Sequence, residues 1–365
     1  MMEINKRNFL KSLLLSSLSI AFPIIVRGKE FRELLVSCYT YNDINYLCTL
    51  NKHGEVQNII ELNFRGHSMA YNKKKNEIIV FGRRPSQLAS VVDLRFNKIT
   101  TTISSKPERH FYGHGSITTD GKYLITTEND MKNLNGLVSI RDIEKNYEVI
   151  NEYSSNGIGP HEILLTQNEK TIIVANGGIA THPSTGRKKL NIDNMDSNLS
   201  FIDIENGNLI NAFSLDDKYQ SIRHICSNKN DDVFFSTQYE GQANTKIPLI
   251  GVNQNNKMIY FNSNETIIRK LLQYSGSIKF NDKDNFLAVT HPRGNKISIW
   301  DTKYKSFVKL LDLNDVCGIS FNDGSLYATN GYGDLREYSY LGYEARYYPK
   351  FNGYKWDNHL ELIKI

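Results

Sequence analysis

The stretch "GHGSITTDGKYLITTENDMKNLNGLVSIRDIEKNYEVI", residues 113–150, decides the fold of this chain. It contains four short apolar runs of period 2, separated by turns rich in Gly, Asn and Asp. Such alternation, bounded by turn residues, is typical of short β-strands. We interpret the stretch as four antiparallel strands, A to D, with about the length of one propeller blade.

The same unit recurs along the chain. A strand ending in aspartate, then a turn and another strand, occurs in "ASVVDLRFNKI", "LVSIRDIEKNYEVI", "LSFIDIENGNLI" and "ISIWDTKYKSFV". Six starts of strand A are predicted, at "GHSMAY" (His67), "GHGSIT" (His114), "PHEILL" (His161), "RHICSN" (His224), "SGSIKF" (Gly276) and "VCGISF" (Cys317). The N-terminal segments "ELLVSCYTYND", "NYLCTL" and "EVQNIIEL" match strands B, C and D of a further blade without strand A.

The missing strand is predicted at the C-terminal end. "NHLELIKI", residues 358–365, aligns with "GHGSIT" and "PHEILL". Placed innermost in the first blade, it would pair the two chain ends in one sheet and protect the sheet edges. The fold class is therefore predicted to be all-β, a seven-bladed β-propeller closed by the C-terminal strand. A two-sheet sandwich is the alternative, and the spacing favours the propeller. No amphipathic helix is expected after residue 28.

Residues 1–28 are predicted to be an export signal, and residues 29–365 the propeller. The segment begins with basic residues, continues as a serine-diluted apolar run and offers Ser19-Ile20-Ala21 as a cleavage site. The order Lys6-Arg7-Asn8-Phe9-Leu10-Lys11 is similar to a twin-arginine signal with Lys in the first position. An ordinary secretory signal is the alternative. Both predict an exported, periplasmic protein.

Charge and cysteine spacing exclude several classes of protein. The net charge is +5, but four basic residues and Glu3 give residues 1–28 a net +3, so the rest carries only +2. Without a dense Lys/Arg run, no nucleic-acid binding is expected. No membrane span is expected after the signal. The four cysteines lack CxxC and CxxCH spacing, which excludes haem c and the common zinc motifs. A disulfide between Cys38 and Cys48, on neighbouring predicted strands, is one interpretation.

Five histidines and one cysteine share a single repeat position. At the start of strand A the seven blades carry His359, His67, His114, His161, His224, Gly276 and Cys317. With nine histidines in 365 residues, a random match at one position is roughly one in forty. Because strand A is innermost, these side chains would converge in a central funnel. Imidazole and thiol favour a transition metal, iron or copper, with zinc as another candidate. The alternative is a polar, water-filled channel.

The loops between strands B and C are expected to cover this funnel, because they emerge at the end where strand A begins. Polar residues there and near strand A are candidates for ligand binding. They are Glu128, Asn129, Asp130, Glu162, Asn176, His182, Arg187, Arg223, Gln238, Glu240 and Arg293. In contrast, Arg83 and Arg84 are predicted to be a solvated loop pair, and Trp300 to pack between blades.

The motifs "RHFYGHG", "TEND", "GIGPHE", "ANGGIATHP…GR", "SIRH", "QYEG", "PRG", "DVCG" and "WDNHL" occur in this order. In them the chain resembles, from about Glu33 to its end, an uncharacterised bacterial family of exported seven-bladed propellers with a domain of unknown function. The resemblance implies a twin-arginine signal, from which Lys6 departs. It also implies that the gene for this chain lies beside genes for imelysin-type iron-uptake proteins. It implies no reaction and no catalytic residue.

Three functions are compatible with these features. The first is an extracytoplasmic propeller that binds a transition metal in the His/Cys-lined funnel and assists metal acquisition, with periplasmic or membrane iron-uptake proteins as partners. The second is a metal-dependent oxidoreductase; a lactonase is disfavoured because its hard cation needs carboxylates rather than imidazoles. The third is a partner-binding scaffold without metal, which leaves the histidines unexplained. Binding is favoured over catalysis.

Overall fold

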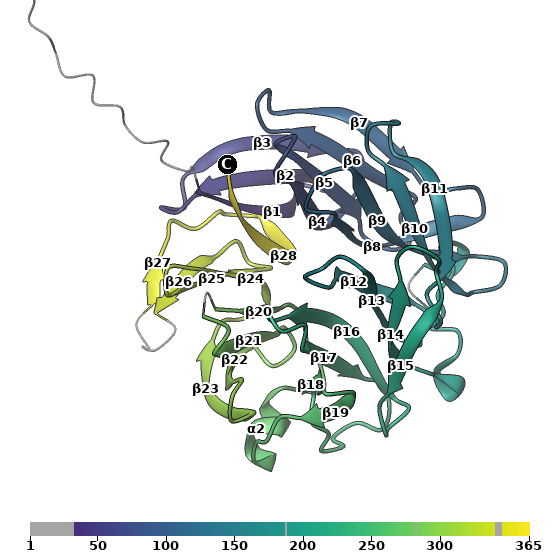
Figure 1. Ribbon diagram of the computed structural model, residues 1–365. Coiled ribbons are helices and arrows are strands. Elements are labelled where there is room, and N and C mark those ends of the chain that lie inside the picture. The colour runs from purple at the N-terminus through teal and green to yellow at the C-terminus, as the bar shows by residue number, and fades with distance from the viewer. Residues whose placement is uncertain (1–32, 187, 282, 340–344) are drawn as a thin grey trace, which may run out of the picture. The chain divides into compact units, whose positions relative to one another are not determined.

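A computed structural model describes residues 33–186, 188–281, 283–339 and 345–365. The predicted export signal lies outside these residues. Seven four-stranded antiparallel sheets are arranged as a ring of blades (Figure 1). The prediction of an all-β, seven-bladed β-propeller is confirmed. None of the helices among the described residues has the length and apolar character of a membrane-spanning segment.

The four strands of each blade follow one another from the centre of the ring outwards. Blade 1 consists of β28 (Lys355–Lys364), β1 (Glu33–Tyr41), β2 (Ile44–Asn51) and β3 (Val56–Leu62). Blade 2 consists of β4 (Gly66–Asn72), β5 (Glu77–Gly82), β6 (Leu88–Asp93) and β7 (Lys98–Ser104). Blade 3 consists of β8 (Arg109–Ile117), β9 (Tyr123–Asp130), β10 (Gly136–Asp142) and β11 (Glu148–Ser154). Blades 4 and 5 are β12 (Pro160–Leu165), β13 (Thr171–Asn176), β14 (Asn198–Asp203), β15 (Leu209–Ser214); and β16 (Gln220–Ser227), β17 (Val233–Tyr239), β18 (Ile250–Gln254), β19 (Lys257–Tyr260). Blades 6 and 7 are β20 (Ile278–Phe280), β21 (Phe286–His291), β22 (Lys296–Asp301), β23 (Ser306–Asp312); and β24 (Val316–Asn322), β25 (Ser325–Asn330), β26 (Leu335–Ser339), β27 (Ala345–Tyr347).

The C-terminal strand closes the ring as predicted. β28 pairs antiparallel with β1, with Glu33 opposite Lys364 and Ser37 opposite Leu360. In Figure 1 the yellow β28 lies beside the purple β1. Because the first blade takes its innermost strand from one end of the chain and its other strands from the opposite end, the ring closes without an unpaired inner edge.

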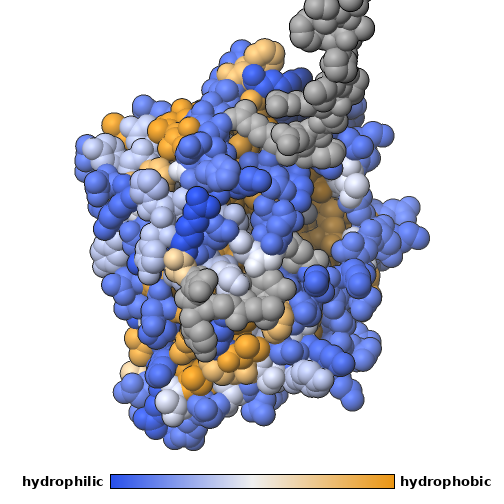
Figure 2. Space-filling model, turned by 90° about the vertical axis from the view of Figure 1, so that its left-hand side faces the viewer, coloured by the Kyte–Doolittle hydropathy of each residue, from blue (hydrophilic) through white to orange (hydrophobic). Residues whose placement is uncertain are grey.

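The core lies between the blades rather than inside one of them. On β5, Ile78 and Val80 join a buried cluster with blade 1, whereas Ile79 and Phe81 join another with blade 3. Successive residues of a strand point to opposite faces, so a strand buried on both faces is apolar throughout. Trp300 packs against Phe261 of the neighbouring blade, as predicted. The outer surface in Figure 2 is mainly hydrophilic, with scattered apolar groups.

Within the described residues, the connections contain three short helices, at positions where no helix is predicted. They are η1 (Pro183–Thr185), η2 (Ile192–Asn194) and α2 (Glu265–Lys270). The side chain of Asn264 caps α2 by accepting a hydrogen bond from the Ile267 N–H. Each of these helices has fewer than two turns, which is too short to give a helical pattern in the sequence.

The possible disulfide between Cys38 and Cys48 does not form, since both thiols are free. The two strands are neighbours as expected, but Cys48 lies opposite Ser37, and Cys38 lies opposite Leu47. An offset of one residue places two side chains on opposite faces of a sheet. The two cysteines therefore belong to different buried clusters, one on each side of blade 1.

Candidate metal centre

Five histidines lie where the innermost strands are interrupted by β-bulges. The pairing of the first two strands shifts register around His67 in β4, His114 in β8 and His161 in β12. It also shifts beside His224 in β16 and across the part of β28 that holds His359. A bulge inserts a residue without a cross-strand partner and redirects its side chain. These bulges allow side chains from five blades to converge.

The five imidazoles, which we call the histidine cluster, form one group among the innermost strands. In eight of the ten pairs of rings the centroids lie 4.7 to 6.2 Å apart. Two sets of three have ligand atoms within 4.8 Å of one another: His67, His114 and His359, and His114, His161 and His224. In a tetrahedral site with metal–nitrogen distances of 2.0–2.1 Å, the ligand nitrogens lie about 3.3 Å apart. The ligand atoms of either set would therefore have to move closer together to bind one ion.

The nitrogen atoms of the cluster are available for binding. All five side chains are buried, yet Nε2 of His114, Nε2 of His359 and Nδ1 of His161 have no hydrogen-bond partner among the described residues. Burial lowers the pKa of His67 to about 4 and lowers the pKa of His114, His161 and His359 well below the ordinary value. At neutral pH these imidazoles are uncharged, which is the form that binds a metal.

Asp357 orients one edge of the cluster. Its Oδ1 lies 3.0 Å from Nδ1 of His67, and Arg83 and Arg65 donate to the same carboxylate at 2.8 to 3.0 Å. Burial alone would raise the pKa of Asp357, but Arg83 and the hydrogen bond from His67 outweigh it and hold that pKa well below its usual range. An ionised Asp357 fixes the proton of His67 on Nδ1 and leaves Nε2 as the free ligand atom.

Glu162 has the same role at the opposite edge. Its Oε2 lies 3.1 Å from Nδ1 of His224 and accepts a hydrogen bond from the Ile225 N–H at 2.9 Å. Its Oε1 lies 3.6 Å from Nδ1 of His114. Histidine ligands of metals usually donate their other nitrogen to a carboxylate. Two carboxylates thus orient two of the five imidazoles, those of His67 and His224, as carboxylates do around metal sites.

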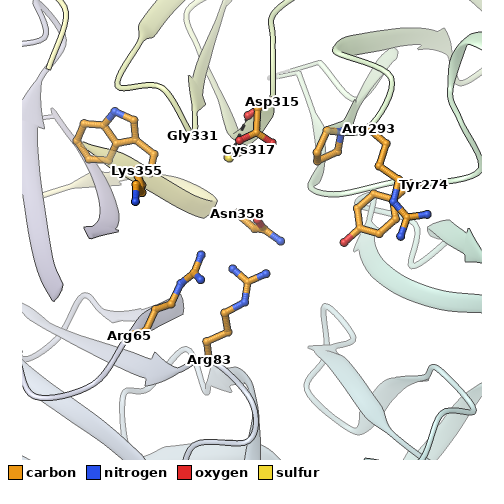
Figure 3. Close-up of a pocket in the computed structure, with 11 residues that line it drawn as sticks. Arg65, Arg83, Tyr274, Arg293, Asp315, Cys317, Gly331, Lys355 and Asn358 are labelled. Carbon is orange, nitrogen blue, oxygen red and sulfur yellow. Dashed lines mark hydrogen bonds between the residues drawn. The ribbon is translucent and has the colours of Figure 1, made fainter. Parts of the chain in front are cut away.

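A cavity of about 410 Å³, which we call the vestibule, lies next to the cluster. Arg65 and Arg83 border it on one side, Tyr274 and Arg293 on the other, and Asn358 lies between them (Figure 3). The guanidinium of Arg293 stacks over the Tyr274 ring, 4.3 Å from its centroid. The vestibule is therefore a mainly basic entrance of the size of a small-molecule site.

A smaller space of about 20 Å³, which we call the inner pocket, joins the vestibule to the cluster. It is lined by three histidines of the cluster, His67, His161 and His224, and by Arg84 and Arg223. The vestibule and the inner pocket share three lining residues, Arg83, Tyr274 and Asn358. A space of this volume holds one water molecule or one small group of a ligand.

Cys317 does not join the cluster, although it occupies the same repeat position. It belongs to neither set of ligand atoms and lines the vestibule instead. Its Sγ donates to the carbonyl oxygen of Asp315 at 3.2 Å. Burial raises the pKa of the Cys317 thiol, so it stays protonated at neutral pH. The position in blade 6 holds Gly276, which has no donor side chain.

Four of the other predicted ligand-binding residues lie at or beside the site. Glu162 contacts the cluster, Arg223 and Gln238 line the inner pocket, and Arg293 lines the vestibule. Gln238 also donates to the carbonyl oxygen of Ser275 at 2.9 Å. These residues come from blades 4, 5 and 6 or their connections, as expected for a funnel assembled by the ring.

The remaining predicted residues serve the blades and loops. Glu128 is buried and pairs with Arg141 at 2.7 Å, and Asn176 donates within blade 4 to Oδ1 of Asn198 at 2.9 Å. Three others have local contacts: Asn129 with Asp130, Asp130 with its own turn, and His182 with Ser184. Glu240 pairs with Lys189, from the loop between β13 and β14 of the neighbouring blade. None of these six lines the vestibule or the inner pocket. Arg187 lies outside the described residues.

Sequence reasoning missed the residues that surround the histidines. The prediction of a solvated Arg83–Arg84 pair is wrong: the Arg83 side chain is 14% exposed and bonds Asp357, and both arginines line the inner pocket. Both arginines follow β5 in a loop between strands B and C, and the loops at this position were predicted to cover the funnel. Their place in the repeat could therefore have indicated that they lie near the histidines. Asp357 precedes His359 by two residues in the same strand. Nothing in the sequence indicated Tyr274.

One protein family matches most of the chain. The family described as "Protein of unknown function (DUF1513)" matches residues 60–363. The chain belongs to this family. The DUF1513 match contains all five histidines of the cluster together with Asp357 and Glu162.

Beyond the DUF1513 family, the comparisons inform the fold alone. No curated protein matches the sequence. Among solved structures, the fold is similar to the hydrazine synthase of Kuenenia stuttgartiensis, with a TM-score of 0.59 and 11% sequence identity over 88% of this chain and 89% of that chain. At this identity the similarity carries no function from one protein to the other.

Proposed function

We propose that the chain is an extracytoplasmic metal-binding propeller whose histidine cluster holds a transition metal ion, iron or copper, with zinc as another candidate. The observation that carries this proposal is the convergence of five buried imidazoles, several with unpartnered nitrogens. Polar atoms buried without a partner are uncommon, and in the cluster several lie close together. Imidazole nitrogen is a preferred ligand of these three metals.

Binding is favoured over catalysis because the space directly beside the histidines admits only one small chemical group. The inner pocket next to the histidines has only about 20 Å³. A metal-dependent oxidoreductase needs an open coordination position with a substrate beside it. A protein that captures an ion needs only an enclosed set of ligands. We therefore assign the protein an accessory role in metal acquisition.

The cellular setting of this proposal comes from the first residues and from the family resemblance. The basic and apolar character of residues 1–28 fits export through the twin-arginine or the general secretory route. The twin-arginine route would carry the protein across the membrane in a folded state. Periplasmic or membrane iron-uptake proteins of the imelysin type are the partners that this setting favours.

Competition titration tests the proposal. The protein, stripped of metal with a chelator, is titrated with Fe²⁺, Cu²⁺ and Zn²⁺ against a chromophoric chelator. The wild type is expected to bind one ion per chain, and the His114→Ala/His161→Ala double variant to lose at least 100-fold in affinity. His53→Ala, at an exposed position on blade 1, is the matched control and should bind as the wild type does. Equal affinity of the double variant and the wild type would reject the ligand assignment.

A further inference from the structure

The inner pocket brings two arginines together without a counter-charge. Arg223 is 1% exposed, and its Nε and NH1 have no hydrogen-bond partner among the described residues. NH1 of Arg84 is also buried and unpartnered there. Both guanidinium groups line the inner pocket. Guanidinium groups that are buried in proteins are normally paired with a hydrogen-bond acceptor. The N–H donors of Arg84 and Arg223 in the inner pocket lack such an acceptor.

The electrostatics of the pair point to the same conclusion. Arginine stays charged in proteins at neutral pH, so two cations line the same small pocket. Arg84 stacks on Tyr112, 5.5 Å from the ring centroid, which holds it in place without neutralising it. Two buried like charges destabilise the fold unless an anion lies between them.

The carboxylates near the pocket are already engaged. Asp357 accepts hydrogen bonds from Arg83, Arg65 and His67. Glu240, whose charge also acts on Arg223, forms an ion pair with Lys189. No carboxylate belongs to the lining of the inner pocket among the described residues. The protein itself therefore does not supply the missing acceptor.

The vestibule defines the size and shape of the ligand. It adds about 410 Å³ to the inner pocket, which is far more than one phosphate or acetate needs. Two further cations, Arg293 and Lys355, lie along its wall, together with the single acidic side chain of Asp315. The positive charges are thus spread between an inner pair and an outer rim. A ligand that satisfies both carries acidic groups at two places.

We propose that the chain binds a small polycarboxylate, with one carboxylate held in the inner pocket by Arg84 and Arg223 and the others facing Arg293 or Lys355, which lie on opposite sides of the vestibule (Figure 3). Arginine binds a carboxylate through parallel N–H donors, which gives both affinity and orientation. The bound carboxylate lies next to His67, His161 and His224 of the cluster. This site is independent of the proposed metal, because each arginine meets the anion directly.

Isothermal titration calorimetry on the metal-stripped protein tests this inference. The probes are citrate, tricarballylate, which has the three carboxylates of citrate without its hydroxyl group, inorganic phosphate and acetate. Citrate and tricarballylate are expected to bind at least tenfold more tightly than phosphate or acetate. Phosphate binding as tightly as either tricarboxylate would overturn the extended ligand and indicate a site for an inorganic oxyanion. No binding of any probe would overturn the site itself.

Matched variants locate the binding. Arg223→Gln and Arg84→Gln are each expected to weaken tricarballylate binding by more than tenfold. Arg95→Gln removes an arginine whose side chain is 57% exposed and paired with Asp93, and it should leave binding unchanged. Arg84→Gln keeps the test valid if Arg223→Gln does not fold, since Arg84 is only partly buried. Wild-type affinity in a folded Arg84→Gln variant would contradict the proposal. Failure of metal binding would not affect this result, because no metal is present.

Discussion

Oδ1 of Asp357 lies 3.0 Å from Nδ1 of His67, although 290 positions separate the two residues in the chain. The contact joins the last strand, β28, to the first strand of blade 2. It depends on ring closure, because β28 is innermost in blade 1 only when it pairs with β1. The orientation of His67, a candidate metal ligand, therefore depends on the closure of the ring.

Replacing Asp357 with Asn is expected to weaken metal binding about 10- to 100-fold, since carboxylates that orient histidine ligands contribute about this much. The variant also leaves Arg83 without its anionic partner, so thermal unfolding must show that the protein is folded at the assay temperature. Competition titration measures the affinity. Asp312→Asn, at a side chain that is 81% exposed, is the matched control. A folded Asp357→Asn variant with wild-type affinity would argue against the role assigned to this carboxylate.

Replacing Cys317 with Ser should leave metal affinity unchanged within about twofold. The thiol hydrogen-bonds the Asp315 carbonyl oxygen and lies outside both sets of ligand atoms. Burial raises its pKa, so no thiolate is available at neutral pH. The same titration measures the effect. A loss of tenfold or more would mean that Cys317 does reach the ion, as its repeat position alone would predict.

Replacing Leu360 with Ala should lower the free energy of unfolding by about 2–5 kcal/mol, the usual cost of a large-to-small change in a core. Leu360 is fully buried between blades 7 and 1, in the strand that closes the ring. Urea unfolding followed by fluorescence measures the change. Leu209→Ala, on the outer strand β15 at 47% exposure, should cost less than about 0.5 kcal/mol. Equal effects of the two substitutions would show that closure by β28 contributes little.

Acidification should destabilise the fold between about pH 6.5 and pH 4. Burial lowers the pKa of His291 from 6.5 to about 4, so the unfolded chain binds more protons than the folded one in this window. The free energy of unfolding therefore falls as the pH falls, by about 2 kcal/mol for this residue between pH 7 and pH 5. Urea unfolding at the two pH values measures it. His291→Gln should reduce the pH dependence by this amount, whereas the exposed His53→Gln should not; an unchanged dependence in His291→Gln would contradict the assignment.

The fold was predictable because its signals repeat. Seven copies of a four-strand unit allow the weak alternation of each strand to be recognised, and the repeat position of His359 locates the closing strand. The convergence of the histidines follows from the same symmetry. In contrast, Cys317 has the repeat position but not the orientation, because side-chain direction depends on local bulge geometry and hydrogen bonding. The sequence position does not contain that information.

The surroundings of the cluster could not be predicted for a related reason. Asp357 and Arg83 meet only because blades 1 and 2 are neighbours in the closed ring, and each residue alone looks like an ordinary charged residue. Glu128 and Asn176 show the converse: they occupy polar loops or strand ends but face partners inside their own blades. Contacts between blades have to be seen in three dimensions.

Elemental analysis of the protein, purified without chelators from the cells that produce it, tests the central claim most directly. Plasma mass spectrometry should find about one iron or copper ion per chain in the wild type and less than a tenth of that in the His114→Ala/His161→Ala variant. A wild-type protein that contains no transition metal and takes up none in metal-replete medium would contradict the account. The histidine cluster would then be the lining of a polar channel.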